Sequence, residues 1–315
     1  MKNFVYFNNK FVTKNKAYVN IDTHALHYGT GFFGGIRGYW NANTKSMFLF
    51  RVKDHLKRLK NSAKLLGLEQ PSDLNNLPEI IVKLLKKNSY KTSVYIRPIV
   101  FVSELTYLKF DLRNLSTTLA ITTVPLEHYL NVKNGVKLMV SSWRRQSSSA
   151  IPPRAKPTGI YLNTALANTE AKTKGFDEAL FLTQDGYVSE GSAENIFFLK
   201  NNKLVTPDLD SDILEGITRR TVVELAKAEL CIETVERKVK LSELLCADEV
   251  FLTGTGAEIT PVIQIDKKKI NKGEIGELTT KLQKLYFEIV HGKNNKYKKW
   301  LTEVKTKGGE IYEKG

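Results

Sequence analysis

Cysteine is almost absent from this 315-residue chain. Only Cys231 and Cys246 occur, and no two cysteines stand at a CxxC spacing. This scarcity argues against a disulfide framework and against a structural zinc site, so we expect no metal. It fits a reducing compartment, and we therefore expect a cytoplasmic protein.

Long apolar runs are missing as well. No run approaches the roughly 18 residues that a membrane-spanning helix needs. The opening stretch, MKNFVYFNNKFVTKNK, lacks the apolar core of a signal peptide. We therefore expect neither a membrane partner nor a cleaved leader.

Acidic residues are outnumbered, since 33 Asp and Glu stand against 48 Lys and Arg, for a formal net charge of +15. Such an excess raises the hypothesis of nucleic-acid binding. The lysines, however, are spread along the chain, often beside asparagine as in 200–203 and 293–299, and no recognised binding module occurs. We interpret the charge as a solvated surface that attracts anions in general, with no nucleic-acid partner.

Hydrophobic residues make up 42% of the chain, enough for a packed core, and the length favours about two domains. Residues 1–126 predict a small α+β domain. Its expected elements are a hairpin over 4–12 turning at Asn8-Asn9, a helix capped by Asp54 and apolar through Leu66, a second helix over 72–87, and strands over 93–102 and 117–126.

Residues 127–135 predict an interdomain linker, and residues 136–291 predict a larger α/β domain. Its expected elements are a strand from 136, a helix over 160–174 closed by Gly175, strands around the following tight turns, a helix over 217–231, a strand–loop–strand unit over 247–265, and a final helix over 274–291. The polar tail at 292–315 is expected to be partly disordered.

The stretch 156–195 holds the most chemical information. It begins with Lys156 before Pro157 and ends in VSEGSAEN, which contains Glu190 and Glu194. A pyridoxal phosphate enzyme requires a lysine that forms a Schiff base with the cofactor and a carboxylate that keeps the pyridine nitrogen protonated. Pro157 favours an extended backbone at Lys156, outside a helix. Taken alone, Lys156 would be one of many surface lysines.

Other motifs accompany this stretch in a consistent order. They are DTHALHYGTGFFGGIRGY (22–39), HLKRLKNSAKLLG (55–67), YIRPIVF (95–101), VSSWRR (140–145), EGITRR (215–220) and DEVFLTGTGAEITPV (248–262). Together they resemble the branched-chain amino acid aminotransferases, which are fold-type IV pyridoxal phosphate enzymes, over roughly residues 4–290. The resemblance implies an α+β, two-domain, D-amino acid aminotransferase-like fold, an active site between the domains, pyridoxal 5′-phosphate as cofactor, and a homodimer or higher homo-oligomer.

The resemblance also implies roles for the cofactor-binding residues. Lys156 would carry the Schiff base, and its freed amine would move the proton between the substrate Cα and the cofactor C4′. Glu190 would contact the pyridine nitrogen, with Glu194 as the alternative, and Tyr161 would contact the 3′-oxygen. The phosphate would be held by Arg58, Gly216, Ile217 and Thr218, the last three ahead of a predicted helix. A solvated arginine and an ordinary helix cap are the plainer interpretations of that last group.

Substrate recognition is implied for a second group of residues. The amides of Thr255 and Gly256 would bind the substrate carboxylate, and Thr255 would also touch the cofactor. The pocket positions fall on Tyr28, Phe33, Gly35, Tyr95, Arg97, Tyr129 and Tyr161. Tyr95 and Arg97 are two residues apart on one strand and so face one side, where Arg97 can meet the distal carboxylate of glutamate. An unpaired arginine buried in an apolar strand would otherwise be costly.

Three departures from the family pattern concern substrate preference. Gly34 stands where many relatives have glutamate, Leu126 stands where some have tryptophan, and the loop 103–114 lacks the glycine-rich sequence of bacterial relatives. In the family this loop reaches the neighbouring subunit's pocket. The main interpretation is transamination between L-leucine, L-isoleucine or L-valine and 2-oxoglutarate. The alternatives are a D-amino acid aminotransferase, an aminodeoxychorismate lyase, and a basic binding protein without catalysis.

Overall fold

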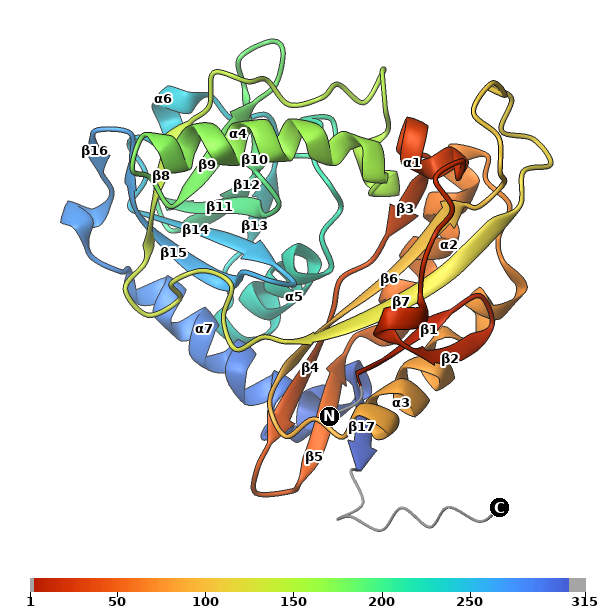
Figure 1. Ribbon diagram of the computed structural model, residues 1–315. Coiled ribbons are helices and arrows are strands. Elements are labelled where there is room, and N and C mark those ends of the chain that lie inside the picture. Colours follow the sequence, from red (N-terminus) through yellow and green to blue (C-terminus); the bar gives the residue numbers. More distant parts are fainter. Residues whose placement is uncertain (1–2, 306–315) are drawn as a thin grey trace.

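The computed structural model describes residues 3–305, which form two β-sheets that lie beside each other (Figure 1). Within these residues the first sheet has eight strands in the order β17-β5-β4-β6-β7-β1-β2, with β3 beside β6. Its pairings are all antiparallel. The strands are β1 (Phe4–Phe7), β2 (Lys10–Thr13), β3 (Gly31–Phe33), β4 (Ile36–Asn41), β5 (Ser46–Phe50), β6 (Val94–Val102), β7 (Thr117–Pro125) and β17 (Leu301–Lys305).

The predicted hairpin at the start of the chain is confirmed. Phe7 pairs with Lys10, which leaves Asn8 and Asn9 as a two-residue turn between β1 and β2. Both asparagines have positive φ, 46° and 62°. Asparagine tolerates this left-handed conformation, which matches the twist of the flanking strands.

Two helices cover one face of the first sheet, α2 (Val52–Leu66) and α3 (Leu77–Asn88) (Figure 1). The prediction that Asp54 caps α2 is wrong, because the helix begins two residues before Asp54 and no side chain caps it. Asp54 instead forms ion pairs with Arg51 at 2.7 Å and with Arg220 at 2.8 Å. The second predicted helix starts as the 3-10 turn η2 (Ser72–Asn76), and α3 follows with Pro78 in its first turn, where no N–H is needed.

The second sheet is mixed. Within the described residues it has nine strands in the order β10-β9-β8-β15-β14-β11-β12-β13, with β16 beside β15. The pairs β8–β9, β8–β15 and β12–β13 are parallel, and the others are antiparallel. The strands are β8 (Val136–Val140), β9 (Glu178–Leu182), β10 (Val188–Gly191), β11 (Asn195–Lys200), β12 (Lys203–Thr206), β13 (Thr234–Glu236), β14 (Glu249–Gly254), β15 (Glu258–Ile265) and β16 (Lys268–Lys269).

Helices cover the second sheet in two places (Figure 1). Helix α4 (Tyr161–Thr173) packs through Ala167 and Ala171 on Phe181, whereas α5 (Ile217–Leu230) and α7 (Glu277–Val290) pack on Phe197 and Phe251. Alternate strand residues, such as Leu180, Phe198 and Leu252, form a separate apolar core. The remaining helical elements are η1 (Lys14–Lys16), α1 (His24–Tyr28), η3 (Pro153–Ala155), η4 (Thr158–Ile160), α6 (Leu241–Leu244), η5 (Asn271–Gly273) and η6 (Asn295–Trp300).

The tail predicted over 292–315 to be partly disordered is ordered in its described part. Residues after 294 form η6 and then β17, which pairs with β5 at the edge of the first sheet. Trp300 packs edge-on against Phe50, and Val304 is 1% exposed in the core. The surrounding lysines and asparagines concealed these apolar positions in the sequence. Residues 306–315 lie outside the described part.

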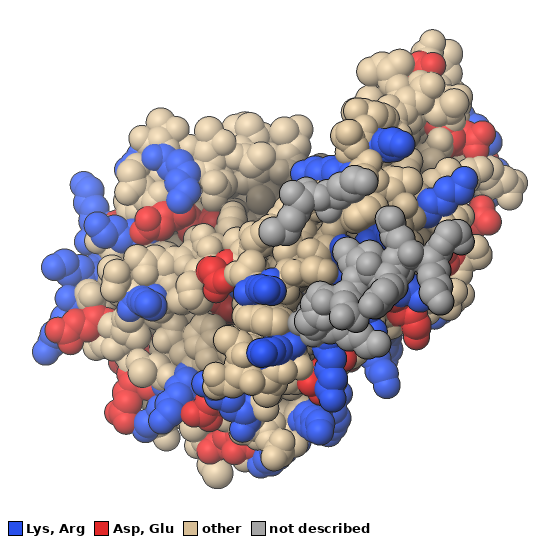
Figure 2. All heavy atoms as spheres, turned by 60° about the horizontal axis from the view of Figure 1, so that its bottom comes forward, with Lys and Arg blue, Asp and Glu red and all other residues tan. Residues whose placement is uncertain are grey.

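Charged side chains of both signs lie on the surface. Figure 2 shows Lys and Arg side chains scattered over the visible face and interspersed with Asp and Glu, with no single large basic patch. Among residues 3–305, no helix is both long enough and apolar enough to cross a membrane.

Candidate active site

One cavity of about 560 Å³ brings nearly all the predicted site residues together between the two sheets. The first sheet and α2 contribute Phe33, Gly35, Arg58, Tyr95 and Arg97, and the connection that follows β7 contributes Tyr129. The second part of the chain contributes Lys156, Tyr161, Glu190, Gly216, Ile217, Thr218, Thr255 and Gly256. Ligand sites are common at such junctions.

Lys156 lies between η3 and η4, at the end of a short turn. Its N–H donates to the carbonyl of Pro153 at 2.9 Å, and its backbone is left-handed, with φ 48° and ψ 50°. The predicted position outside a helix is confirmed, but the predicted extended backbone is wrong. Pro157 disfavours the right-handed helical conformation at the preceding residue, and the turn selects the left-handed one.

The Lys156 amine is enclosed in the cavity and donates to the Tyr161 hydroxyl at 2.7 Å. Desolvation by burial, and then the positive charge of Arg58, lower the pKa of Lys156 to about 7. Burial also raises the pKa of Tyr161 above its ordinary range. A substantial fraction of the amine is therefore the uncharged nucleophile near neutral pH.

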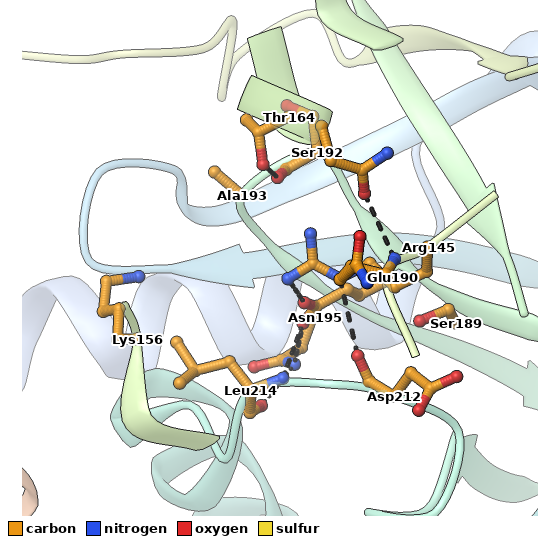
Figure 3. A network of polar contacts seen from close by, with 12 residues as sticks. Arg145, Lys156, Thr164, Ser189, Glu190, Ser192, Ala193, Asn195, Asp212 and Leu214 are labelled. Carbon is orange, nitrogen blue, oxygen red and sulfur yellow. Dashed lines mark hydrogen bonds and ion pairs between the residues drawn. The ribbon is translucent and has the colours of Figure 1, made fainter. Parts of the chain in front are cut away.

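Glu190 lies on β10 and is 3% exposed. Its Oε1 forms an ion pair with Arg145 Nη2 at 2.7 Å, and its Oε2 accepts from Asn195 Nδ2 at 2.9 Å and from the Leu214 N–H at 3.1 Å (Figure 3). Burial raises the pKa of Glu190, whereas the charge of Arg145 acts in the opposite direction. The carboxylate is thus held in one orientation by three donors.

Glu194, the alternative carboxylate, is buried in different surroundings. Its Oε2 accepts from the Ala193 N–H at 3.1 Å, and its side chain packs beside Gly254. Among the described residues no lysine or arginine forms an ion pair with it. Burial and then the charge of Glu178 raise its pKa well above the usual range, so Glu194 favours the neutral form.

Another end of the cavity is suited to an anion. Gly216 is the N-cap of α5, no side chain caps this helix, and Ile217 and Thr218 form its first turn. The Arg58 guanidinium lines the same cavity and has no hydrogen bond or ion pair with any described residue. Free N–H groups at a helix start and an unpaired guanidinium are the donors that typically bind an anion such as phosphate.

The substrate-side residues also converge. Tyr95 and Arg97 face one side of β6, as predicted, and Arg97 Nε donates to the Tyr95 hydroxyl at 3.1 Å. The expectation of a buried charge is wrong, because Arg97 is exposed and its guanidinium lies 4.3 Å from the centre of the Phe33 ring. Gly35 makes room for Tyr95, since a Cβ there would lie 2.4 Å from the Tyr95 hydroxyl.

The turn that joins β14 to β15 carries Thr255 and Gly256 to the cavity. A Cβ on Gly256 would lie 3.6 Å from Tyr129 Cβ, so this turn and the connection after β7 are in close contact.

Tyr28 is the exception among the predicted residues, because it does not line the cavity of its own chain. It lies at the end of α1, donates to the carbonyl of Tyr107 and packs on Phe110 with ring centres 5.3 Å apart. Tyr28 therefore belongs with the loop 103–114, which is exposed.

Sequence reasoning gave no role to Arg145. It follows β8, is 5% exposed and forms the ion pair with Glu190. The motif VSSWRR contains Arg144 and Arg145 side by side. The sequence does not indicate which of these two arginines is buried.

The comparisons with known proteins agree with this geometry. Residues 31–265 match the family described as amino-transferase class IV, and the chain belongs to that family. It is 46% identical over 301 residues to the probable branched-chain-amino-acid aminotransferase of Aquifex aeolicus, with 96% of each chain covered. It is 38% identical to the branched-chain-amino-acid aminotransferase of Escherichia coli K12, covering 96% of this chain and 97% of the other.

Solved structures give the same result. The branched-chain aminotransferase of Thermoproteus uzoniensis with norvaline has a TM-score of 0.92 at 41% identity, covering 96% of this chain and all of the other. The branched-chain amino acid aminotransferase of Thermobaculum terrenum, in its PLP-form, has a TM-score of 0.90 at 36% identity, covering 96% of this chain and 98% of the other. The predicted α+β, fold-type IV architecture is confirmed.

Proposed function

We propose that this chain is a branched-chain-amino-acid aminotransferase. It exchanges an amino group between L-leucine, L-isoleucine or L-valine and 2-oxoglutarate in a reversible, ping-pong cycle. The observation that carries the proposal is the Lys156 amine of lowered pKa, bonded to Tyr161 in the cavity that also holds the Arg145–Glu190 pair. Relatives with this activity in their names align over nearly the whole chain.

The cavity fits pyridoxal 5′-phosphate. Arg58 and the N-terminus of α5, with Gly216, Ile217 and Thr218, would hold the phosphate. Tyr161 would contact the ring oxygen, and Glu190 the ring nitrogen. Bound there, the cofactor supplies an aldehyde for amine attachment and a ring that withdraws electrons from the substrate carbon.

The protein supplies the proton handling. Lys156 has an amine whose pKa of about 7 lets it accept and return a proton at neutral pH. Tyr161 fixes the direction of that amine through the 2.7 Å hydrogen bond. Arg145 favours the charged form of Glu190, which would in turn favour the protonated form of the cofactor's ring nitrogen.

Substrate recognition uses the apolar wall and one cation. Phe33, Tyr95 and Tyr129 accept a branched aliphatic side chain, and the exposed Arg97 guanidinium meets the distal carboxylate of the dicarboxylic substrate. The amides at Thr255 and Gly256 bind the carboxylate that both substrates share. Leu126 lines the cavity and leaves more room than tryptophan would, which bears on substrate preference, whereas a Cβ on Gly34 would face Pro98 and Leu59.

We further propose a homodimer or higher homo-oligomer. The loop 103–114 carries Leu105, Leu108 and Phe110 with 59, 81 and 75% of their surfaces exposed, and exposed Leu26 and Tyr28 come from α1. So much exposed apolar surface is typical of an association site, and a second copy of the chain would cover it. Tyr28 would then complete a pocket across the interface.

The proposal also includes the cellular compartment and the domain boundaries. The two unpaired cysteines, both exposed, suit a reducing cytoplasm. We also propose that residues 1–126 and 136–291 act as two domains joined by 127–135, with β17 added to the first.

Absorption spectroscopy tests the proposed activity. The purified protein, loaded with pyridoxal 5′-phosphate, should lose its visible band on addition of L-leucine and regain it with 2-oxoglutarate. Bleaching by D-alanine but not by L-leucine would favour the D-amino acid aminotransferase instead. A protein that stays colourless after loading would contradict any activity with this cofactor.

A further inference from the structure

A second cavity, of about 570 Å³, opens between the two sheets outside the active site. Its walls come from β4, from the connection after β7, from β15 and from one side of α7. We call it the connection groove, and its ionisable residues are Arg37, Glu127, His128, Lys133, Glu258, Lys284 and His291. Nothing in the aminotransferase reaction uses these side chains.

The floor of the connection groove contains an incompletely compensated arginine. Arg37 is 2% exposed, and its Nη2 donates to the carbonyl of Glu127 at 2.6 Å. The nearest carboxylate oxygen, Glu258 Oε1, is 3.7 Å away, beyond hydrogen-bond distance. Arg37 Nε and Nη1 have no partner among the described residues. The floor therefore has two unmet guanidinium donors beside a loosely paired carboxylate.

Each of the two carboxylates of the groove has one hydrogen-bond partner, whereas Glu258 Oε1 has none among the described residues. Glu258 Oε2 lies 2.8 Å from His128 Nδ1, and the Glu127 carboxylate accepts from the Thr92 hydroxyl. Neither ammonium group of Lys133 or Lys284 has an ion pair within residues 3–305. Both lysines are exposed at the rim. The groove thus holds three cations, Arg37, Lys133 and Lys284, against two carboxylates, Glu127 and Glu258, and its excess positive charge lies at the rim.

We propose that the connection groove binds a small multivalent anion, a polycarboxylate or a phosphate compound. The volume lies within the range of small-ligand sites, about 300–1,000 Å³. Negative groups of the ligand would lie between the two rim ammonium groups and above Arg37. An anion there would join α7, the connection and β4, which belong to different parts of the fold.

The groove shares a wall with the active site. Val124 at the end of β7 and Leu126 and Tyr129 of the connection line the active-site cavity, whereas Glu127 and His128 line the groove. An anion that holds one side of this segment therefore restrains the side chains on its other side. The expected result is a change in the KM of the amino donor, because Tyr129 contacts the turn at Gly256.

The binding test uses the cofactor-loaded enzyme, so that the active-site phosphate position is filled. Inorganic phosphate and citrate are titrated separately in a calorimeter into the parent protein, into Lys133→Ala/Lys284→Ala, and into the charge-matched control Lys267→Ala/Lys268→Ala. We expect saturable binding of one anion per chain, weakened about tenfold or more by the groove variant and unchanged by the control. The probe that binds more tightly distinguishes phosphate from polycarboxylate chemistry.

Two results would overturn the inference. Equal affinity in the parent and in the groove variant would place the anion elsewhere, including in the active site. No saturable binding of either probe would remove the site altogether. The coupling has its own readout: the better probe should change the KM for L-leucine in the parent and not in Lys133→Ala/Lys284→Ala. A KM change that persists in that variant would refute the shared-wall argument, and neither binding result depends on the proposed activity.

Discussion

Arg145 Nη2 lies 2.7 Å from Glu190 Oε1, and both side chains are at most 6% exposed. Asn195 and the Leu214 N–H donate to the other oxygen of the same carboxylate. Burial raises the pKa of Glu190, and Arg145 is the strongest of the groups that favour its charged form, ahead of the Leu214 N–H and Lys156. The charge state of Glu190 therefore depends on a second, almost fully buried side chain.

Arg145→Met should test this dependence. Removing one partner of a buried ion pair typically lowers the unfolding free energy by about 3–5 kcal/mol. Glu190 should then take up a proton, and transamination at neutral pH should fall. The exposed neighbour Arg144 provides the control, and Arg144→Met should change stability by no more than about 0.5 kcal/mol. Equal losses in the two variants, measured by denaturant unfolding, would contradict the assignment.

The lowered pKa of Lys156 predicts how the apoenzyme reacts with pyridoxal 5′-phosphate. Only the neutral amine attacks an aldehyde, and the neutral fraction increases with pH. The loading rate should therefore rise with pH, reach half its maximum near the pKa of about 7, and then level off. Stopped-flow absorption measures this profile. A midpoint near the ordinary lysine value of 10.5 would show that the cavity does not perturb the amine.

Gly35→Ala should displace Tyr95. The added Cβ would lie 2.4 Å from the tyrosine hydroxyl, too close for any real contact, so the ring must move. Overpacking of this kind costs about 1–3 kcal/mol, and we expect a raised KM for both substrates. Adding Tyr95→Phe removes the clashing oxygen and should recover part of the loss. Gly34→Ala, whose Cβ would lie 3.2 Å from Pro98, is the milder comparison.

Val304→Asp tests whether β17 is part of the core. Val304 is 1% exposed, and a carboxylate placed there without a partner should lower the unfolding free energy by about 2 kcal/mol or more. Lys305→Asp changes the next, exposed residue of the same strand and should have little effect. If both variants unfold at the same denaturant concentration, β17 does not contribute as described.

Leu108→Asp/Phe110→Asp should break the proposed association between copies. The two side chains are largely exposed in the single chain, so the substitutions should leave its folding intact. Light scattering after gel filtration should show a smaller assembly. Leu162→Asp, on the exposed side of α4, is the matched control and should keep the parent mass. An unchanged mass in the double variant would place the interface elsewhere.

Sequence patterns predicted the elements whose signals are local. The Asn8-Asn9 hairpin and the helix closed by Gly175 depend on neighbouring residues, and both are present. The cofactor residues were found through motif order, and fourteen of the fifteen predicted positions share one cavity, with Tyr28 the exception. What remained hidden depends on distant contacts.

Three features show the limit. Asp54 has the character of a cap, but its partners Arg51 and Arg220 are set by tertiary packing. Arg144 and Arg145 are the same residue type at adjacent positions, and only the fold determines that Arg145 is the one buried against Glu190. The strand after Trp300 is recognisable only when β5 is known to have a free edge.

The position of β17 has a consequence for how the protein is made. Ser46 on β5 bonds to Glu303 on β17 across 257 residues of sequence. At roughly 5–20 residues per second, a ribosome needs on the order of tens of seconds to span that interval. During this time the outer edge of β5 has unpaired backbone groups, which are open to pairing with other nascent chains. Chaperones that bind the chain during its synthesis should therefore act mainly at this edge.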